Sequence, residues 1–107
     1  MRDWKINPEF LCDKHLLGNH VELHMAVGCL KKGISLNGYI ETGLLEIHNF
    51  EKRHAEIVLE MKKRGFNHKS ALPYYKKTIC GKIDAKKNIL ELKKRCKECR
   101  KRINKLK

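Results

Sequence analysis

Apolar residues recur at helical spacing along the first third of the chain. They lie three or four residues apart on one stripe, which is the pattern of an amphipathic helix. Asp13 stands where such a helix would be capped and Gly33 where it would stop, so we expect a helix from Asp13 to about residue 32. Just upstream, Asn7 and Pro8 match the cap and first position of a short helix. The stripe consists of Leu16, Leu23, Val27 and Leu30.

A second amphipathic stretch spans roughly residues 44–64. Gly65 follows three basic residues, which suit the negative end of a helix dipole, and predicts where this helix ends. Residues 33–43 and 65–82 are rich in Gly, Asn or Pro and are expected to be irregular connections. The apolar side of the second helix would carry Leu44, Ile47, Ile57, Val58 and Met61.

The C-terminal region predicts one long helix from about Asp84 through residue 106. Its apolar positions alternate in steps of four and three, as in a heptad seam, and most of the remaining positions are Lys or Arg. The seam would consist of Ala85, Ile89, Leu92, Cys96, Cys99, Ile103 and Leu106. The whole pattern predicts an all-α fold, with residues 1–107 forming a single compact domain of three main helices.

Positive charge is concentrated in the second half of the chain. The formal net charge is +13, of which residues 1–50 contribute −1 and residues 51–107 contribute +14. A solvated Lys-rich surface would explain the charge alone, but its one-sided distribution favours a polyanion such as nucleic acid as partner. No apolar run is long enough to span a membrane, no secretory signal is evident, and the five cysteines are odd in number. We therefore expect a cytoplasmic protein with free thiols.

Cysteine and histidine spacings offer only weak metal signals. Cys96 and Cys99 form a single CxxC on the predicted seam, and this position favours packing over metal binding. A redox-active CxxC stands at the N-terminus of a helix, whereas this one is expected inside a helix. His20 and His24 are four residues apart and could share a metal, but a hydrogen-bonded His is the commoner case. We expect no metal and no cofactor, and no motif for nucleotide or serine hydrolysis is present.

Two segments carry a more specific signal. Residues 15–23 read HLLGNHVEL and residues 53–67 read RHAEIVLEMKKRGFN. Together they resemble the phage-type pyrimidine-dimer DNA glycosylases, which carry QHLMAEYREL and ECLKRGFN in the same order, and shorter relatives that begin MRIW or MRLW. The resemblance covers about residues 1–70. It implies a DNA-repair enzyme with an all-α fold whose extended N-terminus threads between the helices.

The resemblance also implies a mechanism. Family members use the N-terminal α-amine to form a Schiff base at C1′ of a damaged or abasic nucleotide, and an AP lyase step then cleaves the strand by β-elimination. A glutamate about 21 residues downstream assists, which matches Met1 and Glu22 here; Arg2 should prevent removal of Met1. An α-amine loses its proton more easily than a lysine, so it is a suitable nucleophile. The small Gly18, one turn before Glu22, would leave room for the chain start.

Double-stranded DNA is the expected partner of a monomeric enzyme, placed at the nucleoid, or in a nucleus or virus if the host is eukaryotic. DNA contacts are expected from Arg2, His15, His20, Arg53, Arg64 and Asn67 in the matched region, and from Lys93, Lys94, Arg100 and Lys101 beyond it. Val21 departs from the family, which has an Arg before the glutamate. A non-catalytic DNA- or RNA-binding protein, and a helical interaction protein with a basic face, therefore remain alternatives.

Overall fold

The computed structural model describes residues 1–68 and 70–106, and all regular structure in that part of the chain is helical. The elements in order are η1 (Pro8–Phe10), α1 (Asp13–Lys31), α2 (Asn37–Glu41), η2 (Ile47–Asn49), α3 (Phe50–Lys63), α4 (Ala85–Arg95) and α5 (Lys97–Leu106). The all-α prediction is confirmed. No helix among the described residues is long and apolar enough to cross a bilayer.

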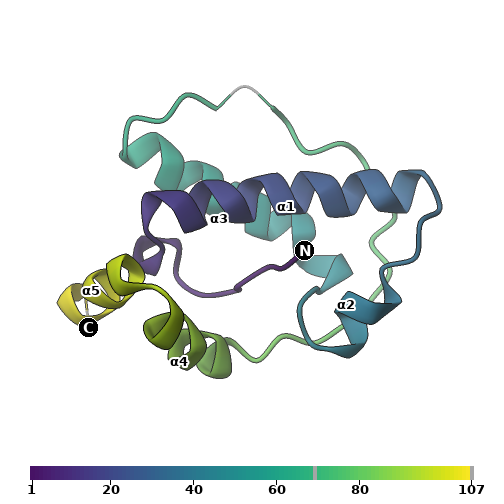
Figure 1. Cartoon of the computed structure of the whole chain (residues 1–107). Helices are drawn as coiled ribbons and strands as arrows, with labels where there is room; N and C mark the ends of the chain where they lie inside the picture. The colour runs from purple at the N-terminus through teal and green to yellow at the C-terminus, as the bar shows by residue number, and fades with distance from the viewer. Residues whose placement is uncertain (69, 107) are drawn as a thin grey trace.

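Helices α1 and α3 pack against each other at the centre of the molecule (Figure 1). The predicted stripe of α1 supplies buried Leu16, Leu23 and Val27, which join Ile57 and Met61 of α3 in one core. Both helices end as the sequence predicts, because Gly33 and Gly65 follow them with φ of 74° and 83°, a conformation that favours glycine. Asp13, predicted as the cap of α1, is instead its first residue, and Cys12 is the N-cap.

The prediction of a helix beginning at residue 44 is wrong. Residues 44–46 are not helical, and α3 begins only at Phe50 after the short η2. Tertiary hydrogen bonds explain the difference, because the Leu44 carbonyl accepts from the backbone N–H of Asp3 (2.9 Å) and the backbone N–H of Ile47 donates to Cys80 (3.0 Å). These bonds use backbone groups that a helix would need for itself. The predicted loop 33–43 in turn contains the short helix α2.

The single long C-terminal helix predicted from the heptad pattern is interrupted at Cys96. This residue has extended backbone angles, φ −130° and ψ 112°, so α4 and α5 are separate helices that change direction at this point (Figure 1). The break lets Cys99 and Ile103 of α5 become fully buried, with α5 packed on η1. Leu106, the last position of the predicted seam, is 44% exposed and belongs to no continuous heptad interface.

The N-terminal segment is fixed by polar contacts with several elements. The backbone N–H of Trp4 donates to the side chain of Asn19 on α1 (3.3 Å), and the Asn88 side chain on α4 donates to the Trp4 carbonyl (2.8 Å). From α3, Arg53 donates to the carboxylate of Asp3 (3.0 Å). The start of the chain is therefore held beside α1, with α3 and α4 as further supports.

Candidate functional site

Met1 and Glu22 line the same open pocket, which has a volume of about 430 Å³. This volume is within the range of small-molecule sites in proteins. The pocket lies between the N-terminal segment and α1, with contributions from α4 and from residue 44. Its lining residues are Met1, Arg2, Trp4, Lys14, His15, Gly18, Asn19, Glu22, Leu44 and Arg95.

The carboxyl group of Glu22 is electrostatically coupled to the start of the chain. Burial raises the pKa of Glu22, while the positive charge of the N-terminal amine and a hydrogen bond from the backbone of Arg2 oppose that rise. A raised pKa keeps a carboxyl group closer to the protonation range in which it can both accept and donate a proton. The pocket thus combines an amine with an acid–base group.

Gly18 faces open space in this pocket. A Cβ atom built on Gly18 would meet no atom within 4 Å, apart from its own helix backbone and neighbours. This space agrees with the expectation that a small residue here leaves room for the start of the chain. An alanine would fit here as well.

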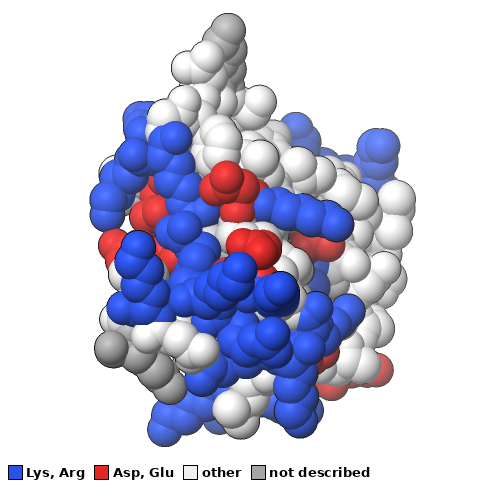
Figure 2. Space-filling view, turned by 60° about the vertical axis from the view of Figure 1, so that its left-hand side comes forward, with Lys and Arg blue, Asp and Glu red and all other residues white. Residues whose placement is uncertain are grey.

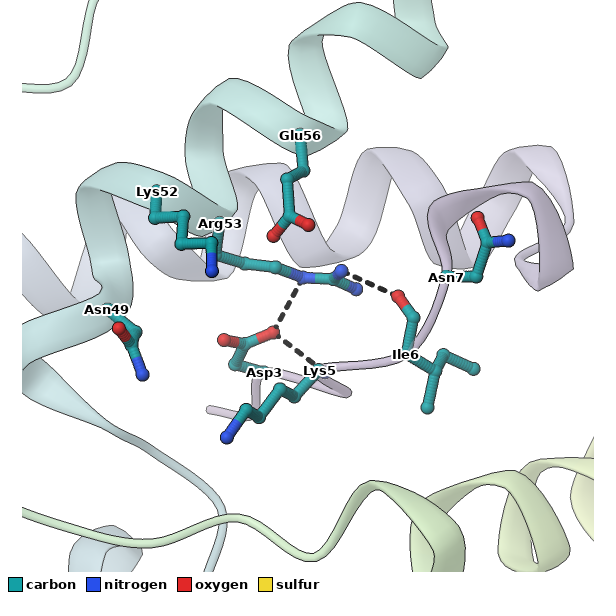
Figure 3. A pocket seen from close by; sticks show the side chains of 8 residues that line it. All are labelled: Asp3, Lys5, Ile6, Asn7, Asn49, Lys52, Arg53 and Glu56. Carbon is teal, nitrogen blue, oxygen red and sulfur yellow. Dashed lines mark hydrogen bonds and ion pairs between the residues drawn. The ribbon is translucent and has the colours of Figure 1, made fainter.

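The beginning of the chain is anchored by two arginines whose charged groups face inward. The Arg2 guanidinium pairs with Glu91 (2.6 Å), donates to Asn88 (2.7 Å) and lies 3.8 Å from the ring centroid of Trp4. Arg53 reaches from α3 to the N-terminal segment, as Figure 3 shows, where it bonds Asp3 (3.0 Å) and the Ile6 carbonyl (2.6 Å).

Several predicted DNA contacts are therefore reassigned. Arg53 is only 4% exposed, and Arg64 donates to Glu60, Asp13 and the carbonyls of Pro8 and Leu11, so their guanidinium groups hold the fold together. Asn67 is exposed and free of such ties among the described contacts. The prediction that Arg2, Arg53 and Arg64 contact phosphate finds no support in these inward-facing arrangements.

Exposed cations gather instead on the C-terminal helices. Figure 2 shows the side of the molecule that carries α5, where Lys and Arg dominate the surface. Of the residues proposed from sequence, Lys94, Arg100 and Lys101 are exposed and Lys93 is half-buried. Lys14 and Arg95, which sequence reasoning missed, are exposed and also line the pocket of Met1 and Glu22. Its position directly before the HLLGNHVEL segment could have singled out Lys14 in the sequence.

Two groups of side chains could hold a metal ion. Cys12, His15, Cys96 and Cys99 place their ligand atoms within 4.8 Å of one another, and so do His20, His24, His54 and His68. His15 and His20, predicted as DNA contacts, belong to these groups. The prediction that the CxxC lies inside a helix is wrong, because Cys96 directly precedes the first residue of helix α5. Neither group is evident from the sequence, because distant segments supply its members; Cys12 and Cys99, for example, are 87 residues apart.

Comparison with protein families gives one match. The family model for pyrimidine dimer DNA glycosylase matches residues 1–74, which include the N-terminal segment, α1 and α3. Neither the curated proteins nor the solved structures gave a match. The matched region contains Met1 and Glu22 and most of the pocket around them. By this match over most of its length, the chain belongs to the pyrimidine dimer DNA glycosylase family, whose members are DNA-repair enzymes acting on DNA.

Proposed function

We propose that this protein is a glycosylase with AP lyase activity that uses the α-amine of Met1 as nucleophile on damaged double-stranded DNA. The observation that carries the proposal is the shared pocket of Met1 and Glu22, in which the charge of the amine acts on the pKa of the carboxyl group. UV pyrimidine dimers and abasic sites are the substrates that the family description and the chemistry favour.

The proposed reaction begins when the neutral amine attacks C1′ and the bond from C1′ to the base breaks. The base takes the bonding electron pair, and the amine loses its protons as the sugar ring opens to an imine, with O4′ accepting a proton. Removal of a proton from C2′ then expels the 3′ phosphate by β-elimination. Glu22 stabilises the positive charge that develops on the sugar and moves protons at O4′ and C2′.

Binding of the duplex is assigned to the exposed cations next to the pocket. Lys14 and Arg95 would contact phosphates on either side of the extruded nucleotide, and the Lys- and Arg-rich surface of α5 would extend that contact along the duplex. These cations would compensate for Val21, which is 53% exposed at a position where the family has an Arg.

Borohydride trapping on a duplex with an abasic site tests the proposal. We expect a covalent protein–DNA adduct that is lost when the N-terminus is acetylated. Glu22→Gln should bind the duplex but cleave it at least a hundredfold more slowly, in keeping with the usual contribution of acid–base groups. The matched control is Glu41→Gln, at an exposed site on α2. Normal cleavage by Glu22→Gln would overturn the assignment.

A non-catalytic DNA-binding protein is the second candidate. The exposed Val21 beside Glu22 favours it, because a phosphate or base contact typical of the family is missing at this position. This candidate predicts salt-dependent duplex binding without any trapped adduct. The same trapping experiment therefore separates the two functions.

A further inference from the structure

Three cysteines and one histidine converge where the start of α1 meets the break between α4 and α5. The Sγ atom of Cys12 lies 3.2 Å from Nδ1 of His15 and 3.8 Å from Sγ of Cys96. The Sγ atom of Cys99 lies 3.5 Å from the same nitrogen of His15. One atom of each side chain thus faces a common point.

These distances are those of a tetrahedral zinc site. Bond lengths of about 2.3 Å for zinc–sulfur and about 2.0–2.1 Å for zinc–nitrogen place two sulfurs about 3.8 Å apart, and a sulfur and a nitrogen about 3.6 Å apart. We propose that Cys12, His15, Cys96 and Cys99 form a structural zinc site. Two short spacings, CxxH and CxxC, supply the four ligands, a combination typical of closed zinc sites.

Backbone groups around the cluster support thiolate ligands. The N–H of Cys12 donates to Sγ of Cys99 (3.2 Å), and the N–H of Cys99 donates to Sγ of Cys96 (3.4 Å). Such donors stabilise the negative charge of a metal-bound sulfur. A disulfide is a poorer explanation, because one histidine nitrogen and a third sulfur share the same centre and a bond would join only two of the sulfurs.

The site would explain the interrupted C-terminal helix. Cys96 is the extended residue between α4 and α5, and its backbone turn brings Cys96 and Cys99 to one centre. Both residues lie beyond the region matched by the family model, whereas Cys12 and His15 lie inside it. The zinc would therefore fasten the basic C-terminal helices to the helix that carries Glu22, and keep Arg95 at the pocket.

Cobalt substitution tests this site in the full-length protein. The chain, prepared in reductant and loaded with Co²⁺, should show sulfur-to-cobalt charge-transfer absorption and the visible bands of four-coordinate cobalt, which Zn²⁺ abolishes. Cys99→Ser should lose at least half of the charge-transfer intensity, while Cys29→Ser, the control outside the cluster, should retain it. Absence of charge transfer in the unmodified chain, or equal spectra for the two variants, would overturn the proposal.

A second cluster of four histidines is independent of the first. Its members come from α1 (His20 and His24), from α3 (His54) and from the segment that follows α3 (His68). The Nε2 atom of His54 lies 3.2 Å from Nε2 of both His20 and His24. The Nε2 atom of His68 is buried and has no hydrogen-bond partner among the residues that the structure describes.

Hydrogen bonds alone do not satisfy this arrangement. A neutral imidazole has a single N–H and a single lone pair, so Nε2 of His54 can make only one good bond to its two neighbours. Burial, together with the neighbouring histidines, lowers the pKa of His20 and His54 to about 4, so both rings are neutral near pH 7. We infer that these four histidines bind a divalent transition metal, for which two nitrogens about 3.3 Å apart are the tetrahedral expectation.

Metal counting separates this site from the cysteine site. In the Cys96→Ser/Cys99→Ser background, the full-length chain dialysed against Zn²⁺ should retain close to one equivalent per chain by mass spectrometry of the metal. Adding His68→Gln should weaken the remaining Zn²⁺ affinity at least tenfold, whereas His48→Gln, outside the cluster, should not. No bound zinc in that background, or the same zinc affinity with and without His68, would overturn the second proposal.

Discussion

Replacing Arg53 by methionine should lower the free energy of unfolding more than any surface substitution does. Arg53 is 4% exposed and Asp3 is 1% exposed, and the guanidinium also donates to Ile6 (2.6 Å) and Asn19 (3.2 Å). Without Arg53, the Asp3 carboxylate would lose its guanidinium partner and keep neutral donors such as the backbone N–H of Lys5 (3.0 Å). Breaking a buried pair from one side typically costs about 3–5 kcal/mol.

We expect a value near the lower end, about 3 kcal/mol, because Asp3 can take up a proton when its partner is lost. At roughly 4–8 °C per kcal/mol for a chain of this size, the Tm should fall by about 12–24 °C. Urea unfolding followed by circular dichroism measures the free energy directly. Lys52→Met, at an exposed neighbouring position, is the matched control and should change stability by less than about 0.5 kcal/mol.

The double variant Asp3→Asn/Arg53→Met isolates the cause. Since it leaves no buried unpaired charge, its loss of stability should be smaller than the sum of the two single losses. At a temperature where Arg53→Met stays folded, trapping on abasic DNA should still slow down, because the start of the chain has lost its link to α3. A cost below about 1 kcal/mol, or one equal to that of Lys52→Met, would refute the reasoning.

Three further results are expected. Gly81→Ala should destabilise the protein by more than about 1 kcal/mol, because φ is +95° and the new Cβ would lie 2.2 Å from a backbone oxygen. Gly28→Ala, in open space on α1, should instead stabilise the protein by up to about 1 kcal/mol, and thermal unfolding of the two variants compares these effects. Lys14→Gln should reduce the salt dependence of duplex binding by about one unit of slope, and Lys31→Gln, also exposed on α1, should not. In metal-free protein, the free energy of unfolding should fall as the pH drops from about 6.5 towards 4, because burial lowers the pKa of His54 and the unfolded chain therefore binds more protons than the folded one. In His54→Gln, the free energy measured by urea unfolding should depend less on pH over this range.

Much of the fold follows from local sequence. Helix α1 has both an apolar stripe and a glycine stop, and α3 ends at Gly65, so local pattern and tertiary structure agree there. The start of α3 could not be predicted, since the apolar spacing near residue 44 suits a helix, but the Leu44 carbonyl accepts from the distant N–H of Asp3 and the N–H of Ile47 donates to the distant carbonyl of Cys80. The break at Cys96 likewise depends on tertiary contacts of α5 with η1, which no heptad pattern contains.

The candidate site was only partly accessible from sequence. Glu22 has no distinguishing spacing of its own, and only the resemblance to a family singled it out. Arg53 differs most from its expected role, because a basic residue in a matched motif was expected to face DNA, whereas the structure buries it against Asp3. The metal clusters were missed because spacing within one helix reveals neither Cys12 beside Cys96 nor His54 beside His24.

The central claim is that the reacting nitrogen is the α-amine of Met1. Borohydride-trapped adduct on an abasic duplex can be digested and its modified peptide sequenced by mass spectrometry. The account predicts that the sugar remnant is attached to the α-nitrogen of Met1 and that Glu22→Gln greatly lowers its yield. Attachment to a lysine side chain such as Lys14, or tight binding with no adduct at all, would contradict it.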